Sequence, residues 1–253
     1  MPVTTPARPR SGFRLADLTW IEAADLIGDG LPVVLPIGAA ARAHGPHLPL
    51  GTDRLVVEAV AERLLARMPL LVAPSIGLGY HPAFMDYPGS QHLEATTFEA
   101  LVVELIEGYL RHGAERILLL NNGISTEAPL RLAAQTILQR HGIRIASADL
   151  PRLHDDAASD DERDTSLLLA IAPALVRMDR LGETGDLATD DEPALRVLRQ
   201  PLRLTPEERP GGLLNRSGAM ADASAATAEK GERLLADMVE AIAADLRQLW
   251  PDL

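Results

Sequence analysis

Two histidines and an aspartate fall within ten residues of this chain, in the segment His-Gly-Pro-His-Leu-Pro-Leu-Gly-Thr-Asp at residues 44–53. Imidazole and carboxylate groups are side chains that bind divalent ions such as zinc, manganese and iron. The prolines and glycines between them restrict the backbone and hold the turns of the segment in place. His44 and Asp53 are therefore the first candidates for a metal or substrate site. We interpret His47 as a structural residue of the turn.

Two predicted elements would position this segment. Residues 31–37 are a continuous apolar run, which is typical of a strand buried on both faces. After the segment, apolar residues at helical spacing predict a helix that runs to about residue 68, with Thr52 or Asp53 as its cap. The segment therefore lies at the carboxyl end of a strand, where open α/β sheets bind their ligands.

The alternation of strand and helix continues along the chain. Further strands are predicted at 70–74, 117–121 and 143–150, and further helices at 96–113 and from about 126 to 142. Capping-box patterns at 19–22 and 96–99 mark the starts of two helices. Strands that alternate with helices predict a parallel sheet with helices on both faces. The fold class is therefore α/β, a three-layer αβα arrangement around a mostly parallel central sheet.

The outer parts of the chain suggest a single domain. We interpret residues 1–12 as a disordered tail and residues 13–253 as one α/β domain, because neither a repeat nor a linker divides them. A long amphipathic helix is predicted at about 226–249. The stretch 182–218 is rich in proline, glycine and charge, and we interpret most of it as a surface excursion or an oligomer contact.

Composition excludes several kinds of site and partner. The 24 basic and 36 acidic residues leave a formal net charge of −12, which argues against a nucleic-acid partner or an anionic membrane surface. The chain has no cysteine, so disulfides, thiolate metal sites and a cysteine nucleophile are excluded. It also shows neither a long apolar span nor a signal-peptide core. We therefore expect a cytoplasmic protein without membrane contact.

The segment at 44–53 resembles the signature of the creatininase (creatinine amidohydrolase) family. Weaker resemblances to the family's motifs follow in the same order at residues 87–90 (Tyr-Pro-Gly-Ser), 117–121, 164–167 (Asp-Thr-Ser-Leu) and 227–231. The resemblance covers about residues 16–245 and implies the creatininase fold. It also implies a metal-dependent amidohydrolase that cleaves a C–N bond of a small or cyclic amide, assembled as a homo-oligomer, a hexamer.

The resemblance carries over only part of the family's site. His44 and Asp53 fall on metal-ligand positions, and Asp53 matches the carboxylate that bridges two ions. Asp164 stands where the family has a glutamate. The positions of the other ligands and of a catalytic histidine are taken here by Arg42, Gly123, Ser125 and Ser159. An arginine at a ligand position repels a divalent ion, by about 8 kcal/mol at 4 Å for an effective dielectric constant of 20.

Other imidazoles could rebuild such a site. His81 and His92 lie in a long loop predicted at 77–95, which we interpret as a wall of the site. A lone histidine in a loop is more often solvated than functional. His154 lies five residues before Ser159 and could take the place of the missing histidine through a shift of its loop.

Two functions remain open. The first is a divergent hydrolase of the creatininase type, acting on a small-molecule substrate with a depleted metal site. In it, His44, Asp53 and Asp164 bind at most one zinc, manganese or iron ion. The candidate catalytic residues are Asp164, Glu162 and Arg42.

The second function is non-catalytic. Such a pseudoenzyme keeps the scaffold and the oligomer without a metal, and it binds a small ligand or a homologous subunit. Arg42 would then pair with Asp53 or Asp164 and replace the charge of the metal. A nucleotide-binding Rossmann protein is disfavoured, because no Gly-x-Gly-x-x-Gly motif follows the first strand.

Overall fold

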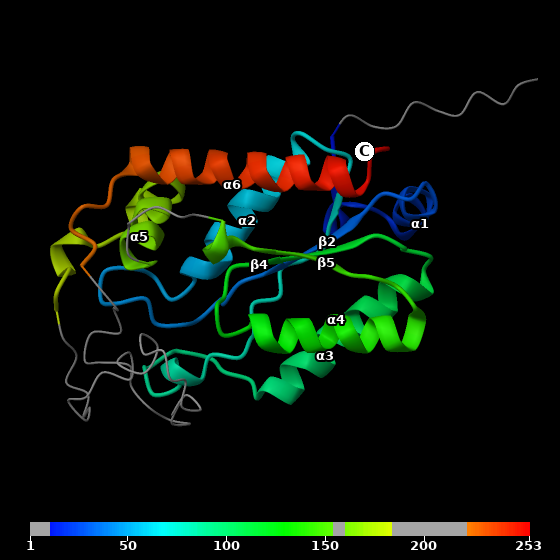
Figure 1. Ribbon diagram of the computed structural model, residues 1–253. Helices are drawn as coiled ribbons and strands as arrows, with labels where there is room; N and C mark the ends of the chain where they lie inside the picture. The colour runs from blue at the N-terminus through cyan, green and yellow to red at the C-terminus, as the bar shows by residue number, and fades with distance from the viewer. Residues whose placement is uncertain (1–10, 154–159, 184–221) are drawn as a thin grey trace, which may run out of the picture.

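The central sheet of the protein is parallel throughout. A computed structural model describes residues 11–153, 160–183 and 222–253 (Figure 1). Within them, five strands are arranged in the order β1-β3-β2-β4-β5. Their bounds are Phe13–Arg14 for β1, Val33–Ile37 for β2, Leu71–Val72 for β3, Ile117–Asn121 for β4 and Ala146–Asp149 for β5. The parallel sheet confirms the predicted α/β fold class. β1 was not predicted, because two residues carry no readable pattern.

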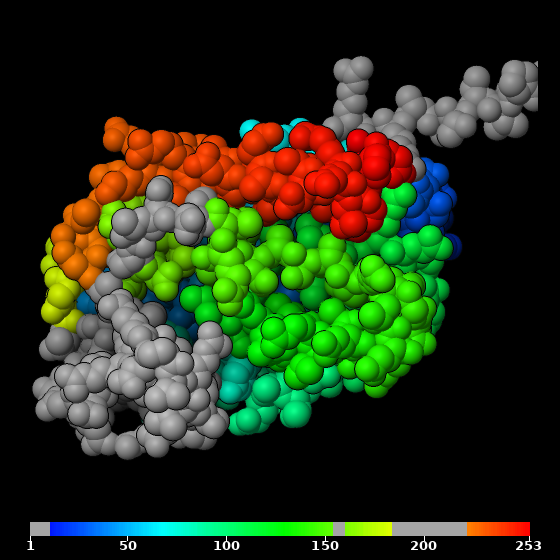
Figure 2. All heavy atoms as spheres, in the orientation of Figure 1, coloured from blue at the N-terminus to red at the C-terminus, as the bar shows by residue number. Residues whose placement is uncertain are grey.

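Helices cover both faces of the sheet. They are α1 (Trp20–Gly28), α2 (Thr52–Leu65), α3 (Ala95–Arg111), α4 (Glu127–His141), α5 (Asp160–Ile171) and α6 (Ala228–Leu249). Short 3₁₀ helices lie at Leu15–Asp17, Pro82–Phe84, Leu150–Arg152, Pro173–Leu175 and Met178–Arg180. The α2, α5 and α6 helices lie on one face and α3 and α4 on the other (Figure 1). The space-filling view shows α6 and α4 on opposite sides of the molecule (Figure 2).

Alternate side chains of the central strands enter two separate apolar cores. Val34 and Leu118 pack with the α2–α5–α6 layer, whereas Val33 and Ile117 pack with α3 and α4. Successive side chains of a strand point to opposite faces of its sheet, so a strand covered on both sides must be apolar at every position. This is why residues 31–37 read as a continuous apolar run.

Only one of the two predicted capping boxes forms. The Thr19 hydroxyl accepts from the Glu22 backbone N–H, and the Glu22 carboxylate accepts from the Thr19 N–H at 2.8 Å. The box predicted at 96–99 is wrong, because α3 already begins at Ala95, and Glu94 before it provides no side-chain cap. The N-cap lies two residues before the predicted one, so Thr96 falls inside the first turn, where it cannot cap.

The predicted cap of α2 is also wrong. The N-cap is Gly51, and it makes no side-chain cap bond. The Thr52 hydroxyl donates to the carbonyl oxygen of Pro49 at 2.7 Å instead. Asp53 lies in the first turn and binds side chains of the preceding loop, so its carboxylate belongs to the candidate site. A carboxylate at this end of a helix also interacts favourably with the helix dipole.

β2 and β4 are neighbours at the centre of the sheet, where the order of strand addition reverses from one side of β2 to the other. The strand that follows β2 along the chain, β3, pairs on one side, and β5 pairs with β4 on the other. Open α/β sheets bind ligands in the crevice at such a switch point. Residues 38–51 and 122–126 follow these two central strands, as the sequence predicted.

Helix α6 approaches α5 so closely at Gly231 that a side chain does not fit. A Cβ atom there would lie 1.9 Å from the backbone oxygen of Ser166. We expect Gly231→Ala to lower the free energy of unfolding by about 3 kcal/mol, since the two helices must move apart. Gly108→Ala in α3 is the matched control: nothing lies within 4 Å of its Cβ, and it should stabilise by about 0.5–1 kcal/mol. Urea unfolding followed by circular dichroism measures both, and equal effects would contradict this contact.

Two predicted regions lie largely outside the described residues. Residues 1–10 belong to the predicted tail, and 184–221 to the predicted surface excursion. Gly12 is part of the folded chain, because its N–H donates to the Leu65 carbonyl oxygen at 2.7 Å. The division into a tail and one domain stays a prediction. No helix in the described part of the chain is long and apolar enough to cross a membrane.

Candidate functional site

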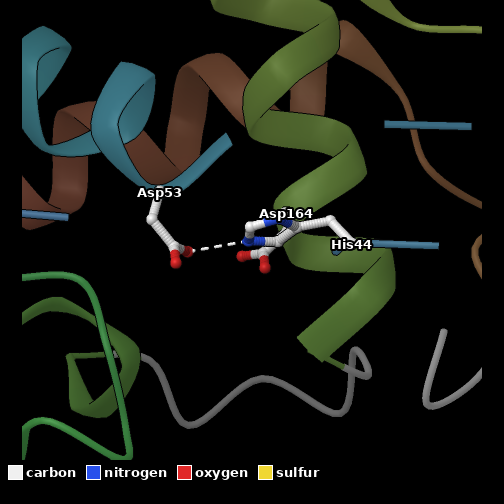
Figure 3. Close-up of side chains that lie close together, drawn as sticks. All are labelled: His44, Asp53 and Asp164. Atoms are coloured by element: carbon white, nitrogen blue, oxygen red, sulfur yellow. Dashed lines mark hydrogen bonds and ion pairs between the residues drawn. The ribbon is translucent and has the colours of Figure 1, made fainter. Parts of the chain in front are cut away.

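Three of the predicted site residues meet beyond the carboxyl end of the sheet. His44 belongs to the loop after β2, Asp53 to the first turn of α2 and Asp164 to α5 (Figure 3). All three are buried, and each offers a ligand atom that lies within 4.8 Å of the other two. The fold therefore assembles the predicted donor set from three separate segments. We call these residues the His44–Asp53–Asp164 cluster.

Arg42 occupies one side of this cluster. Its Nε donates to Asp53 Oδ2 at 2.8 Å and its Nη2 to Asp53 Oδ1 at 3.1 Å, a bidentate ion pair. The guanidinium also lies over the ring of Phe84, 4.5 Å from its centroid. The predicted pairing of Arg42 with Asp53 is therefore present in the structure.

Electrostatics keep both members of this pair charged. Burial by itself would raise the pKa of the Asp53 carboxyl, but Arg42 and His44 hold that pKa well below its usual range. Burial opposes the charge of Arg42 in the same way, yet Asp53, Asp164 and Asp161 together raise the pKa of its guanidinium. The two desolvated charges therefore depend on each other.

The His44 ring is oriented by the backbone. Its Nδ1 lies 2.7 Å from the carbonyl oxygen of Arg42, which can only accept, so Nδ1 carries a proton. The other ring nitrogen, Nε2, lies 2.5 Å from Arg42 Nη2 and 2.9 Å from Asp53 Oδ1. Metal-binding histidines are commonly oriented by such a bond from the other ring nitrogen.

On α5, the residue that joins Asp164 near the cluster is Asp161 rather than Glu162. Asp161 and Asp164 are three residues apart, so they share a face of the helix. Both act on the charge of Arg42. Glu162 accepts from the Lys230 ammonium at 2.6 Å, against α6. Its catalytic role stays a prediction. The three-residue spacing was the signal that could have identified Asp161.

Arg163 holds the second carboxylate of the cluster. Its Nη2 donates to Asp164 Oδ1 at 3.1 Å, and its Nη1 donates to Asp160 Oδ1 at 3.0 Å. Because Arg163 and Asp164 are both buried, this pairing fixes the carboxylate without exposing it to water. Arg163 was not predicted from the sequence, because an arginine next to its own partner looks like an ordinary charge in an acidic run.

The turn after β4 has no room for a side chain at Gly123. A Cβ there would lie 2.6 Å from Thr126 Oγ1. That hydroxyl donates to Asn121 Oδ1 at 2.8 Å, and the Gly123 N–H donates to the same oxygen at 3.1 Å. The polar groups of the turn therefore hydrogen-bond to one another. Asn122 reaches the cluster instead, with Nδ2 3.4 Å from Asp53 Oδ1.

The histidines of the loop after β3 differ from the expectation that they are solvated. His81 is 3% exposed. Burial, with the neighbouring Arg42, lowers its pKa to about 3, so the ring is neutral. His92 Nδ1 accepts from the His81 backbone N–H at 3.0 Å and holds the loop. His154 and Ser159 lie outside the described residues.

His47 has the structural role expected of it. Its Nε2 lies 2.8 Å from Thr165 Oγ1, which ties the loop after β2 to α5. Burial lowers its pKa, and the adjacent His44 acts in the same direction.

Because His81 is neutral in the folded protein, we expect the folded protein to lose stability at acidic pH. The unfolded imidazole takes up a proton below pH 6.5, whereas the folded one does so only at about pH 3. The unfolded state therefore binds more protons in this window, and stability falls as pH drops through it. His81→Gln should reduce this slope, which urea unfolding at several pH values measures. An unchanged slope would contradict a buried, neutral His81.

Comparison with known proteins decides the family. A model of the creatininase family, described as creatinine amidohydrolase, matches residues 16–246. The chain belongs to the creatininase family. Mycofactocin precursor peptide peptidase of Mycolicibacterium smegmatis is 30% identical over 230 residues, which are 87% of this chain and 86% of that protein. Creatinine amidohydrolase of Pseudomonas putida is 28% identical over 266 residues, 94% of this chain and 97% of that protein.

A solved structure described as "Creatininase Mn" has the same fold. It matches with a TM-score of 0.75 and 24% identity, over 95% of this chain and 99% of the other. The creatininase fold predicted from the segment at 44–53 is thus confirmed along almost the whole chain.

The creatininase family implies metal ions, and among the described residues one set of metal-ligand side chains gathers at this site. His44, Asp53 and Asp164 offer one nitrogen and carboxylate oxygens, which zinc, manganese and iron accept. At Gly123, where the resemblance to the family implies a ligand histidine, the chain has no side-chain donor. Even a single ion would have to compete with Arg42, because Arg42 Nη2 contacts both His44 Nε2 and Asp53 Oδ1.

Proposed function

We propose that this chain is a divergent creatininase-family hydrolase that cleaves an amide or cyclic amide C–N bond of a small molecule, with at most one divalent ion. The buried His44–Asp53–Asp164 cluster at the switch point of the sheet is the observation that supports it. The relatives point to the same class of reaction, because an amidohydrolase and a peptidase both hydrolyse amide-type bonds. A homo-oligomer, a hexamer in the family, is part of the proposal.

In this proposal, His44, Asp53 and Asp164 would hold one zinc, manganese or iron ion. Such an ion polarises a carbonyl group and lowers the pKa of bound water. Arg163 keeps Asp164 in position through its hydrogen bonds to Oδ1. The Arg42 guanidinium is suited to stabilise negative charge that develops on a carbonyl oxygen, because it is always protonated and already lies in the cluster. Asp164 is the candidate acceptor for a proton of the substrate or water.

The ion pair of Arg42 with Asp53 favours a second candidate function. The guanidinium contacts both oxygens of Asp53 and the ring of His44, so it neutralises the cluster without a metal. A pseudoenzyme of this kind would bind a small ligand or a homologous subunit on the creatininase scaffold.

Metal content separates the two functions. The protein, purified without chelator, is analysed for zinc, manganese and iron by mass spectrometry. The hydrolase should retain up to one equivalent, lost on Asp164→Asn. Less than about a tenth of an equivalent of all three, after incubation with each ion as well, would reject the metal-dependent hydrolase and leave the pseudoenzyme.

A further inference from the structure

The state of the His44–Asp53–Asp164 cluster depends on where the Arg42 side chain lies. Arg42 Nε and Nη2 contact the two oxygens of Asp53, and Nη2 also lies 2.5 Å from His44 Nε2. Asp53 and His44 are candidate metal ligands, so an ion can bind both of them only after the guanidinium moves away. A contact that holds the guanidinium in place would therefore weaken metal binding at the cluster.

The backbone on both sides of Arg42 is held by the loop after β3. The carbonyl oxygen of Ala41 accepts from the N–H of Gln91 at 2.8 Å. The N–H of Ala43 donates to the hydroxyl oxygen of Ser90 at 3.1 Å. These two bonds fix the point from which the Arg42 side chain starts. The same loop also contacts the end of that side chain.

Phe84 makes the contact at the end of the side chain. The Arg42 Cζ atom lies 4.5 Å from the centre of the Phe84 ring. The attraction between a cation and the face of an aromatic ring is stronger when the cation is shielded from water, and the Arg42 side chain is only 17% exposed. This contact therefore stabilises the guanidinium in the position that pairs with Asp53.

Phe84 is itself held within a short turn. It ends the 3₁₀ helix Pro82–Phe84, and its N–H donates to the carbonyl oxygen of His81 at 3.1 Å. Its carbonyl oxygen accepts from the N–H of the buried Tyr87 at 3.2 Å, and the centres of the two rings are 6.0 Å apart. The Phe84 ring is therefore a fixed surface against which the guanidinium packs.

Phe84 lies outside both apolar cores. Neither of the two cores, as the described residues form them, includes Phe84, whereas Tyr80 of the same loop packs against one of them. Phe84 is only half-buried. Its contact with Arg42 is therefore not a by-product of core packing.

We propose that Phe84 is a positioning residue that keeps the Arg42 guanidinium on Asp53 and His44 and thereby weakens the binding of a divalent ion. The proposal rests on the metal site proposed above and names the contact that limits binding at that site. The apparent affinity for an ion scales with the fraction of molecules in which the guanidinium has moved away. The loop after β3 thus acts on the cluster through Arg42.

The test replaces the aromatic ring and measures metal affinity. Phe84→Leu keeps an apolar side chain without the ring face, whereas Phe84→Tyr keeps the ring and is the matched control. Isothermal titration of Zn²⁺ into the metal-free full chain should show about tenfold tighter binding by Phe84→Leu, because loss of the cation–π contact releases the guanidinium. Phe84→Tyr should stay within about twofold of the parent. Equal affinities of Phe84→Leu and the parent would overturn the proposal.

An Arg42→Met background tests whether Phe84 acts through Arg42. Arg42→Met keeps a long side chain without the charge, so Phe84→Leu should then change the Zn²⁺ affinity by less than about twofold. An undiminished effect in this background would contradict our inference, because a residue that only shapes the site would produce it. Phe84→Ile, which also lacks the ring, takes the place of Phe84→Leu if that variant does not fold.

Hydrogen exchange at Arg42 gives a readout that needs no metal. Arg42 Nε donates to Asp53 Oδ2 at 2.8 Å, so its hydrogen exchanges with water when the guanidinium moves away. NMR of the metal-free protein, with Arg42→Met to assign the signal, should show about tenfold faster exchange in Phe84→Leu and an unchanged rate in Phe84→Tyr.

The two readouts distinguish this inference from the proposed function. Faster exchange in Phe84→Leu, in a protein that takes up no metal even as Arg42→Met, supports the role of Phe84 and rejects the metal-dependent hydrolase. Metal uptake by the parent, with exchange and affinity both unchanged in Phe84→Leu, rejects the role of Phe84 alone.

Discussion

Arg42→Glu should raise the affinity of the protein for Zn²⁺ or Mn²⁺ at least about a hundredfold. The substitution removes a guanidinium that contacts His44 Nε2 and Asp53 Oδ1, and it adds a carboxylate beside them. The repulsion between a guanidinium and a dication reaches about 8 kcal/mol at 4 Å and an effective dielectric constant of 20. A hundredfold change requires only about 2.8 kcal/mol, so the effect survives a large correction for screening.

Isothermal titration of each ion into the metal-free protein measures this affinity. Arg54→Glu is the matched control, because it makes the same change of charge next to Asp53, yet Arg54 pairs with Glu58 and both side chains are more than a third exposed. Its effect should stay below about threefold. Equal metal affinity in parent and Arg42→Glu would show that Arg42 does not compete for the ligand atoms.

Asp53→Asn is expected to cause a large loss of stability, about 3–5 kcal/mol in the free energy of unfolding. It leaves the Arg42 guanidinium buried without the carboxylate that neutralises it, and breaking one side of a buried pair is far more harmful than losing a surface pair. Glu62→Gln is the control, because Glu62 forms a bidentate but exposed pair with Arg14 and should cost less than about 1 kcal/mol. Similar losses in urea unfolding would argue against a buried, mutually dependent pair.

The same carboxylate makes a distinct contribution to the pH dependence of stability. The pKa of Asp53 is held below its ordinary value of 3.8, so the folded state binds fewer protons than the unfolded state in this range. The contribution of Asp53 to the free energy of unfolding is fully present above about pH 4 and is lost as pH falls further. Asp53→Asn should flatten the stability profile in this acidic window, measured by urea unfolding. A profile as steep as that of the parent would assign the acid sensitivity to other groups.

The fold could be predicted because its signals are local. A strand between two helical layers must be apolar on both faces, and β2 and the first four residues of β4 are unbroken apolar runs for that reason. Gly142 ends α4 as predicted, in the left-handed conformation that glycine adopts without strain. The predicted helix caps of α2 and α3 were wrong, because a shift of one or two positions at the start of a helix moves a side chain out of capping geometry.

The site was predicted in part, and its limits follow from distance along the chain. The sequence by itself determined the family, and with it the candidate donors His44, Asp53 and Asp164. Only the tertiary structure decided that Arg42 holds both oxygens of Asp53. It alone buries His81 with an unpaired Nε2 beside Gly123. These contacts join loops that follow different strands. Their geometry is set by the packing of the sheet and helices, which no local pattern in the sequence records.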